Sequence, residues 1–265
     1  METLPNFDDF AATYNSGSPQ LVWTVLVADL ETPVSAMLKL ADDPTYSFLL
    51  ESVQGGEVRG RYSAIGLKPD LIWRCRQGKA EINRNGLTQA DDFSQCPEPP
   101  LDSLRALIAE CRIDIPDPLP PMAAGLFGYM GYDMVRQMES LPDNNPDTLD
   151  VPEGVFLRPT VMAVFDTIED SVFVITPVWA QDGVSAKDAY GAAQARLAET
   201  FAKFDADLAP HHVLKPLSGD ALPIEPDSNT SREEYHAIVE KAKEYIRAGD
   251  IFQVNLAHRL LYPAG

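Results

Sequence analysis

The sequence predicts an α+β protein in which antiparallel hairpins are combined with separate helices. Apolar runs of strand length recur through the first two thirds of the 265 residues. Short polar turns at Gln77-Gly78 and Glu169-Asp170 each join two of these runs, which is typical of hairpins. Helical spacing of apolar residues appears between the strands, and again in two longer stretches that begin at Ser185 and Ser231.

The first predicted elements alternate between helix and strand. Residues 7–14 have the spacing of a short helix, whereas residues 21–28 (LVWTVLVA) form a continuous apolar run that is typical of a buried strand. Pro33 begins a helix, since its fixed φ angle suits a first helical turn. Further strands are predicted at residues 46–53, 61–67, 71–76 and 79–84.

Prolines and glycines divide the middle of the chain. A helix begins at Leu101 after a proline-rich linker and ends before the prolines of residues 116–121. Glycines then recur at every third position from Gly125, and close packing of a strand explains this spacing better than a phosphate loop, because no helix is signalled after them. The predicted elements here are a strand at 123–132, a solvated loop at 140–154, a hairpin of strands at 155–165 and 171–179, and a helix from 185 to about 204.

The composition changes near residue 209. Residues 209–229 contain four prolines and no periodicity, which indicates a linker between two parts of the chain. We therefore predict an N-terminal domain at residues 1–208 and the start of a second domain at residues 230–265.

The second domain begins with clear signals. Ser231 and Glu234 form a capping box before an amphipathic helix, and Gly249 stands at the position of its C-terminal cap. Residues 251–260 (IFQVNLAHRL) are predicted to form a strand. Because one helix and one strand cannot build a core, we expect these 265 residues to be the front part of a longer protein.

Composition and charge exclude several classes of function. The formal net charge is −19 and the isoelectric point is near 4.4, so nucleic acid and anionic membrane surfaces are poor partners. No apolar run is long enough to span a bilayer. Three widely spaced cysteines without a C-x-x-C pattern favour a reducing, cytoplasmic compartment.

One polar segment, residues 48–67, could hold an amino acid. Glu51 can accept hydrogen bonds from an ammonium group, and Ser52 and Arg61 can donate to a carboxylate. Strand alternation places Leu50 and Ser52 on one face and Glu51 on the other, so both polar side chains reach one pocket only if a bulge intervenes. The alternative is an edge strand followed by a polar turn.

Three segments together resemble the anthranilate synthase component I family. They are LLESVQGGEVRGRYSAIGLKP (49–69), AGLFGYMGYDMVRQMESLP (124–142) and residues 231–260 with YIRAGDIFQVNLAHRL. The run Asn255 to Arg259 departs from the family pattern and is similar to aminodeoxychorismate synthase component I, an enzyme of folate synthesis. That second family stays open as an alternative, although the N-terminal half favours the first.

The resemblance implies a fold, a reaction and partners. The family has two orthogonally packed antiparallel β-sheets with flanking helices. It aminates chorismate with ammonia from a glutamine amidotransferase subunit (component II) and releases anthranilate and pyruvate for tryptophan synthesis. Mg²⁺ is the implied cofactor. The resemblance places its ligands, and the residues that bind chorismate, beyond Gly265.

The resemblance also implies a feedback site for L-tryptophan. The family's inhibitor contact falls on Ser52, with Glu51, Leu50 and Arg61 beside it. Gln253 stands where relatives that use water carry a lysine base, and a neutral amide there suits ammonia as the nucleophile, although Gln253 can equally be an ordinary strand residue. Two further hypotheses remain: a non-catalytic module that binds an amino acid, and a purely structural fragment.

Overall fold

A computed structural model describes residues 2–27, 30–42, 45–54, 58–143, 147, 149–208 and 226–262. The chain divides into two compact units, residues 1–209 and 210–265. The predicted linker lies mostly outside the described residues, as do His211 and His212 within it.

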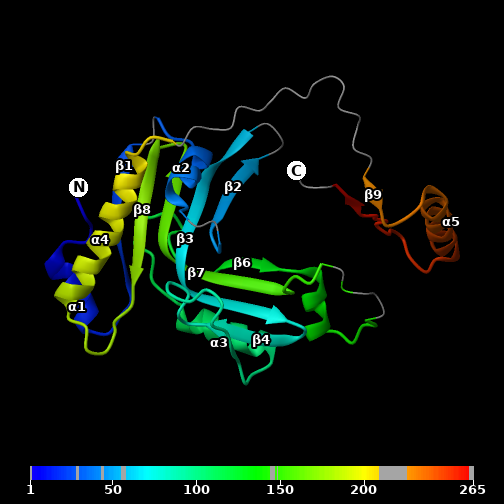
Figure 1. Ribbon diagram of the computed structural model, residues 1–265, viewed down its shortest axis with the longest axis horizontal. Helices are drawn as coiled ribbons and strands as arrows, with labels where there is room; N and C mark the ends of the chain where they lie inside the picture. The colour runs from blue at the N-terminus through cyan, green and yellow to red at the C-terminus, as the bar shows by residue number, and fades with distance from the viewer. Residues whose placement is uncertain are drawn as a thin grey trace. The chain divides into compact units, whose positions relative to one another are not determined.

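Unit 1 is built on one eight-stranded antiparallel sheet with strand order β1-β8-β7-β3-β4-β5, to which β2 adds on β3 and β6 on β7 (Figure 1). The strands are β1 (Gln20–Val27), β2 (Phe48–Gln54), β3 (Val58–Arg76), β4 (Lys79–Asn83), β5 (Ser94–Gln95), β6 (Phe127–Met130), β7 (Gly154–Asp166) and β8 (Ser171–Val178). The predicted α+β class with antiparallel sheets is therefore confirmed.

The two longest strands, β3 and β7, join two parts of this sheet that run in different directions (Figure 1). They pair from Tyr62 opposite Asp166 to Cys75 opposite Gly154. β2 and β8 pair with one end of these strands, and β4 and β6 with the other. The two expected sheets are thus two parts of one bent sheet, and the strands predicted at 61–67 and 71–76 are a single strand.

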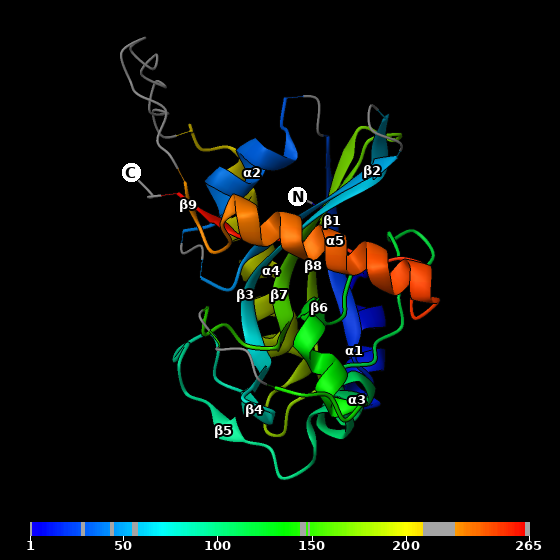
Figure 2. The same ribbon diagram turned by 90° about the vertical axis from the view of Figure 1, so that its right-hand side faces the viewer.

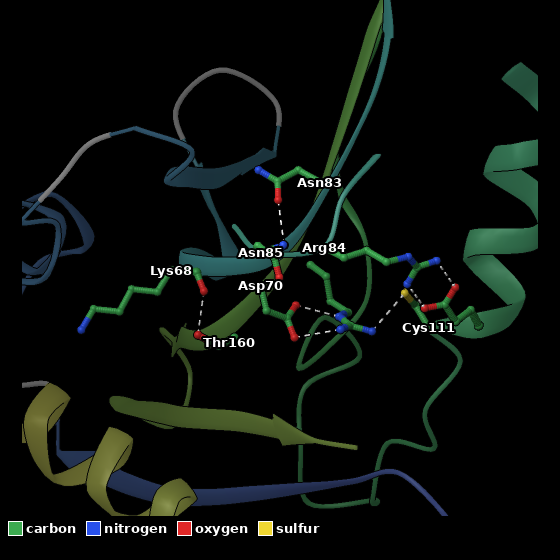
Figure 3. Close-up of polar contacts among 9 residues, drawn as sticks. Lys68, Asp70, Asn83, Arg84, Asn85, Cys111 and Thr160 are labelled. Carbon is green, nitrogen blue, oxygen red and sulfur yellow. Dashed lines mark hydrogen bonds and ion pairs between the residues drawn. The ribbon is translucent and has the colours of Figure 1, made fainter. Parts of the chain in front are cut away.

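The bend coincides with a shift in the register of β3 and β7. Pro69 lies opposite Pro159 and Leu71 opposite Arg158, so Asp70 is an extra residue on β3. The carboxylate of Asp70 accepts two hydrogen bonds of 2.8 Å from the guanidinium of Arg158, which also donates to the Cys111 sulfur at 3.7 Å (Figure 3). The guanidinium lies 4.1 Å from the ring centroid of Trp179. This ion pair connects both strands at the bend.

Three helices cover one face of the sheet (Figures 1 and 2). They are α1 (Phe7–Asn15), α2 (Pro33–Leu40) and α4 (Ala186–Phe204). Their buried side chains, among them Phe10, Leu40 and Leu197, share a core with Ile65 of β3 and Val174 of β8. All three helices lie where apolar spacing predicted them.

A different helix covers the other part of the sheet. Helix α3 (Pro100–Glu110) buries Leu104 and Leu107 against Trp73 of β3, and the Trp73 indole donates a 3.1 Å hydrogen bond to Ser103 Oγ. The predicted strand at 123–132 is shorter, because residues 123–126 are not in a strand and a 3₁₀ helix η1 (Tyr132–Gln137) begins soon after β6. Close packing explains Gly128, since a Cβ there would lie 1.8 Å from the carbonyl oxygen of Val155.

Unit 2 contains helix α5 (Arg232–Ala248) and the short strands β9 (Asp227–Ser228) and β10 (Leu260–Leu261). The capping box of Ser231 and Glu234 is present, and Gly249 ends the helix with φ +80°. These helix signals are confirmed.

The strand predicted at residues 251–260 is wrong, since only Leu260 and Leu261 are extended and paired. A strand requires backbone partners, and among the described residues of unit 2 β9 alone supplies them. Local apolar alternation cannot reveal whether such a partner exists.

In the described parts of the chain, no helix has the length and apolarity that crossing a bilayer demands.

Candidate functional site

A cavity of about 510 Å³ lies at the end of β2, within unit 1. Four segments that are distant in the sequence form its wall: the end of β2, the start of α2, the middle of β3, and the turn from β7 to β8. The polar residues that line it are Glu31 and Thr32, just before α2, and Glu51, Ser52, Ser63, Asp166, Thr167 and Asp170. The cavity therefore contains two of the residues that the sequence singles out, Glu51 and Ser52.

A bulge allows both of these side chains to line the same cavity. Glu51 lies opposite Ser63 of β3, but Val53 lies opposite Arg59, so the register shifts across Ser52. In a regular strand, neighbouring side chains would point to opposite faces. The irregularity is the condition that strand alternation required, and with it a carboxylate and a hydroxyl face one space.

Arg61 reaches the cavity only through Asp166. Its Nε lies 3.0 Å from both carboxylate oxygens of Asp166, and its Nη2 lies 2.7 Å from Oδ2. Asp166 lines the cavity with its side chain only 3% exposed, whereas Arg61 is 44% exposed and is not among the lining residues. The backbone N–H groups of Ile168 and Glu169 also donate to Asp166 Oδ1.

These contacts determine the charge of Asp166. Hydrogen bonds from Arg61 lower the pKa of the Asp166 carboxyl, burial opposes this effect, and the two backbone N–H groups add to the lowering. Asp166 is therefore ionised and paired, so it contributes little net charge to the cavity.

The remaining carboxylates give the cavity its electrostatic character. Glu31 accepts hydrogen bonds from Lys39 and Ser35 on α2. Within the described part of the chain, neither Glu51 nor Asp170 has an ion-pair partner. A cationic group such as an ammonium would find acceptors in Glu51 and Asp170, and the hydroxyls of Ser52 and Ser63 could donate to a carboxylate.

Two other sequence candidates lie elsewhere. Leu50 is 53% exposed and is not among the residues that line the cavity. Gln253 belongs to unit 2, where it is exposed and lies outside any strand. The structure thus brings Glu51 and Ser52 together in one cavity and places Arg61 behind Asp166.

The described residues do not form a magnesium site. Across the described ranges, no group of three or more histidine, cysteine, aspartate or glutamate side chains is arranged to hold a metal ion. Mg²⁺ prefers several oxygen ligands around it, so these residues do not fit the cofactor that the family resemblance implies.

Comparison with protein families identifies the chain. A model of the family described as "chorismate binding enzyme" matches residues 56–265, which is most of the sequence. The chain belongs to the chorismate-binding enzyme family. The match includes β3, the β7–β8 turn and all of unit 2.

Curated members of this chorismate-binding family are similar over nearly the whole chain. A protein of Cereibacter sphaeroides named anthranilate synthase component 1 is 49% identical over 95% of the chain and 50% of its own length. Proteins with the same name from Synechocystis sp. and Thermus thermophilus are 34% and 36% identical, over 97% and 89% of the chain. The chain spans about half the length of the curated relatives it matches.

A solved structure shows the same fold. The crystal structure of anthranilate synthase component I from Streptococcus pneumoniae TIGR4 matches with a TM-score of 0.53 over 85% of the chain and 45% of the solved chain. The sequences are 20% identical, so this likeness concerns the fold. It supports the bent antiparallel sheet with covering helices as the architecture of this family member.

Sequence reasoning missed the other polar residues that line the cavity: Glu31, Thr32, Ser63, Asp166, Thr167 and Asp170. Three of them flank the predicted Glu169-Asp170 turn, where Asp170 adopts a positive φ of 47°. The turn itself was recognisable, but its position beside β2 depends on the pairing of β3 with β7. No local sequence pattern indicates that pairing.

Replacing Asp166 by asparagine is expected to weaken the acid dependence of stability in this family member. Because the folded-state pKa of Asp166 is lowered, its ionised form stabilises the fold above the unfolded-state pKa of about 3.9. That contribution is lost as the pH falls through the lower, folded-state pKa. Urea midpoints measured downward from about pH 5 should therefore fall less steeply in the variant.

Asp102→Asn provides the matched control, because Asp102 is exposed and contacts only Arg105 on its own helix among the contacts described. Its pH profile should follow that of the parent. If the Asp166→Asn profile also follows the parent, the Arg61–Asp166 pair does not contribute to acid stability.

Proposed function

We propose that the chain is the N-terminal part of an anthranilate synthase component I. The complete protein would convert chorismate and ammonia to anthranilate and pyruvate, as a carbon–oxygen lyase of tryptophan synthesis. The 49% identity to a relative of that name supports this most strongly. The similarity to aminodeoxychorismate synthase concerns only residues 255–259, so that alternative is not favoured.

The N-terminal unit has a regulatory role in this proposal. L-Tryptophan binds as a feedback inhibitor at the cavity of Glu51 and Ser52, with Leu50 and Arg61 nearby. The observation that carries this assignment is that Glu51 and Ser52 line one cavity where the register between β2 and β3 shifts, so that a carboxylate and a hydroxyl share one space. An α-amino acid presents both an ammonium and a carboxylate, so it matches this pair of groups.

The remaining partners follow from the same assignment. Residues 1–208 form the regulatory domain, and residues 230–265 begin the domain that binds chorismate, with Gln253 at its active-site wall. A glutamine amidotransferase, component II, supplies ammonia in the cytoplasm. Mg²⁺ is the cofactor of the complete protein and supplies Lewis-acid chemistry when bound, through ligands other than the residues described here.

The proposal predicts that the 265-residue chain makes no anthranilate on its own. The purified chain is incubated with chorismate, Mg²⁺ and excess ammonium salt, and anthranilate is followed by its fluorescence. The described residues provide no metal-binding group, so no turnover above background is expected. The protein expressed from the complete reading frame serves as the positive control.

The same assay separates the competing hypotheses. Anthranilate from the complete protein supports the proposal, whereas aminodeoxychorismate would identify the folate enzyme. Tryptophan binding without turnover by the complete protein would favour a non-catalytic module. Turnover by the 265-residue chain comparable to that of the complete protein would show that the active site has been misplaced.

A further inference from the structure

Ser52 lies directly against Gly60 of β3. A Cβ atom built on Gly60 would lie 2.2 Å from Ser52 Oγ, 2.4 Å from Ser52 Cβ and 2.8 Å from the Ser52 carbonyl oxygen. Real Cβ atoms essentially never approach other heavy atoms below 3.0 Å. Gly60 is buried, so the present position of Ser52 exists only because residue 60 has no side chain.

The backbone around Gly60 is anchored from the opposite side. Thr167 donates its backbone N–H and its hydroxyl to the carbonyl oxygen of Arg61, at 2.9 Å and 3.0 Å. The same hydroxyl lies 3.4 Å from the carbonyl oxygen of Gly60. Arg61 is also held by Asp166 through three hydrogen bonds. Because β3 is fixed here, a side chain at position 60 would move Ser52 rather than β3.

We propose that Gly60 is a positioning residue for the inhibitor site, because it allows the Ser52 hydroxyl to face the cavity. This inference rests on the proposed function, which names L-tryptophan as the ligand of Ser52. Gly60 does not line the cavity and acts only through Ser52. Residue 60 therefore determines how sensitive the enzyme is to its inhibitor.

The first test is Gly60→Ala in the protein expressed from the complete reading frame. The inhibition constant for L-tryptophan should rise roughly tenfold or more, which corresponds to losing a hydrogen bond to a charged group. Inhibition is scored as a fraction of each variant's own uninhibited rate, and tryptophan binding is measured directly by calorimetry. A loss of stability alone would not change the dissociation constant of the folded protein.

Gly66→Ala is the matched control on the same strand. A Cβ at Gly66 would lie 2.2 Å from ring atoms of Phe48, so this substitution also disturbs the β2–β3 pair. Phe48 packs in the core and does not line the cavity. Gly66→Ala should lower the melting temperature yet leave the tryptophan inhibition constant within about twofold of the parent.

A double variant connects the effect to Ser52. Ser52→Gly removes two of the three atoms that a Cβ at position 60 would meet. Adding Gly60→Ala to Ser52→Gly should therefore weaken tryptophan binding no further, and part of the lost thermal stability should return. This variant also keeps the test decisive if Gly60→Ala alone fails to fold.

The outcomes are distinct. If the parent protein is inhibited by tryptophan and Gly60→Ala is inhibited equally, the positioning role is wrong and the proposed function stands. The role is also wrong if Gly66→Ala weakens inhibition as much, or if the effects of Ser52→Gly and Gly60→Ala multiply. If the parent is not inhibited at all, both the tryptophan site and this role are overturned.

Discussion

Ser52→Phe is expected to raise the L-tryptophan concentration for half-inhibition about a hundredfold or more. The substitution removes the hydroxyl that, in the proposed function, donates to the ligand, and it adds a ring to a cavity of about 510 Å³. The ring has no space on the Gly60 side, where Ser52 is already in close contact. It must therefore occupy the space that the inhibitor would use.

Inhibition curves of the complete protein measure this effect, with chorismate turnover recorded in the absence of tryptophan. Turnover should be largely retained, because the inhibitor and the substrate occupy different sites in the proposed function. Ser94→Phe is the matched control, since Ser94 is an exposed serine on the edge strand β5 of the same sheet. A Ser52→Phe protein as sensitive to tryptophan as the parent would disprove the site.

The second large effect is a loss of stability, which is expected when the ion pair at the bend of the sheet is removed. Arg158→Ala should reduce the free energy of unfolding by about 3 kcal/mol or more, because it leaves the Asp70 carboxylate partly buried without its cation. The side chain of Arg158 is only 15% exposed, and it donates to Asp70 and to Cys111 (Figure 3). It also stacks on the ring of Trp179. Urea unfolding of the 265-residue chain measures the change.

Two variants sharpen this experiment. Arg158→Lys keeps the charge but cannot form both hydrogen bonds to Asp70 or stack its flat group on Trp179, so it should recover only part of the loss. Arg105→Ala removes an exposed ion pair with Asp102 and should cost less than about 1 kcal/mol. Equal losses for Arg158→Ala and Arg105→Ala would show that the bend does not depend on this pair.

Local signals predicted most of the elements of unit 1. Pro33 begins α2, Ser185 caps α4 with its hydroxyl, and the apolar run near residue 21 is β1. Each of these features depends on a few neighbouring residues, so the sequence contains them directly. The strand predicted at 251–260 failed for the opposite reason, since pairing depends on a partner that local alternation does not specify.

The candidate site was predictable only in part. Glu51 and Ser52 carry recognisable chemistry, and alternation showed that a bulge was needed to unite them. The bulge arises in the pairing of β2 with β3, whereas the contact of Asp166 with Arg61, 105 positions away, depends on the register of β3 with β7. Contacts of this kind arise from the tertiary fold and leave no periodic trace in the sequence.

The strand order also determines when each strand can pair while the chain is being synthesised. Val27 of β1 pairs with Ser171 of β8, and Gln20 pairs with Val178, so β1 leaves the ribosome long before its partner exists. At about 5 to 20 residues per second, the delay amounts to roughly 7 to 32 s. During this interval the apolar side chains of β1, including Leu21 and Trp23, have no sheet to pack against. The apolar side chains of β1 therefore need shielding, for example by chaperones, until β8 emerges and pairs with this strand.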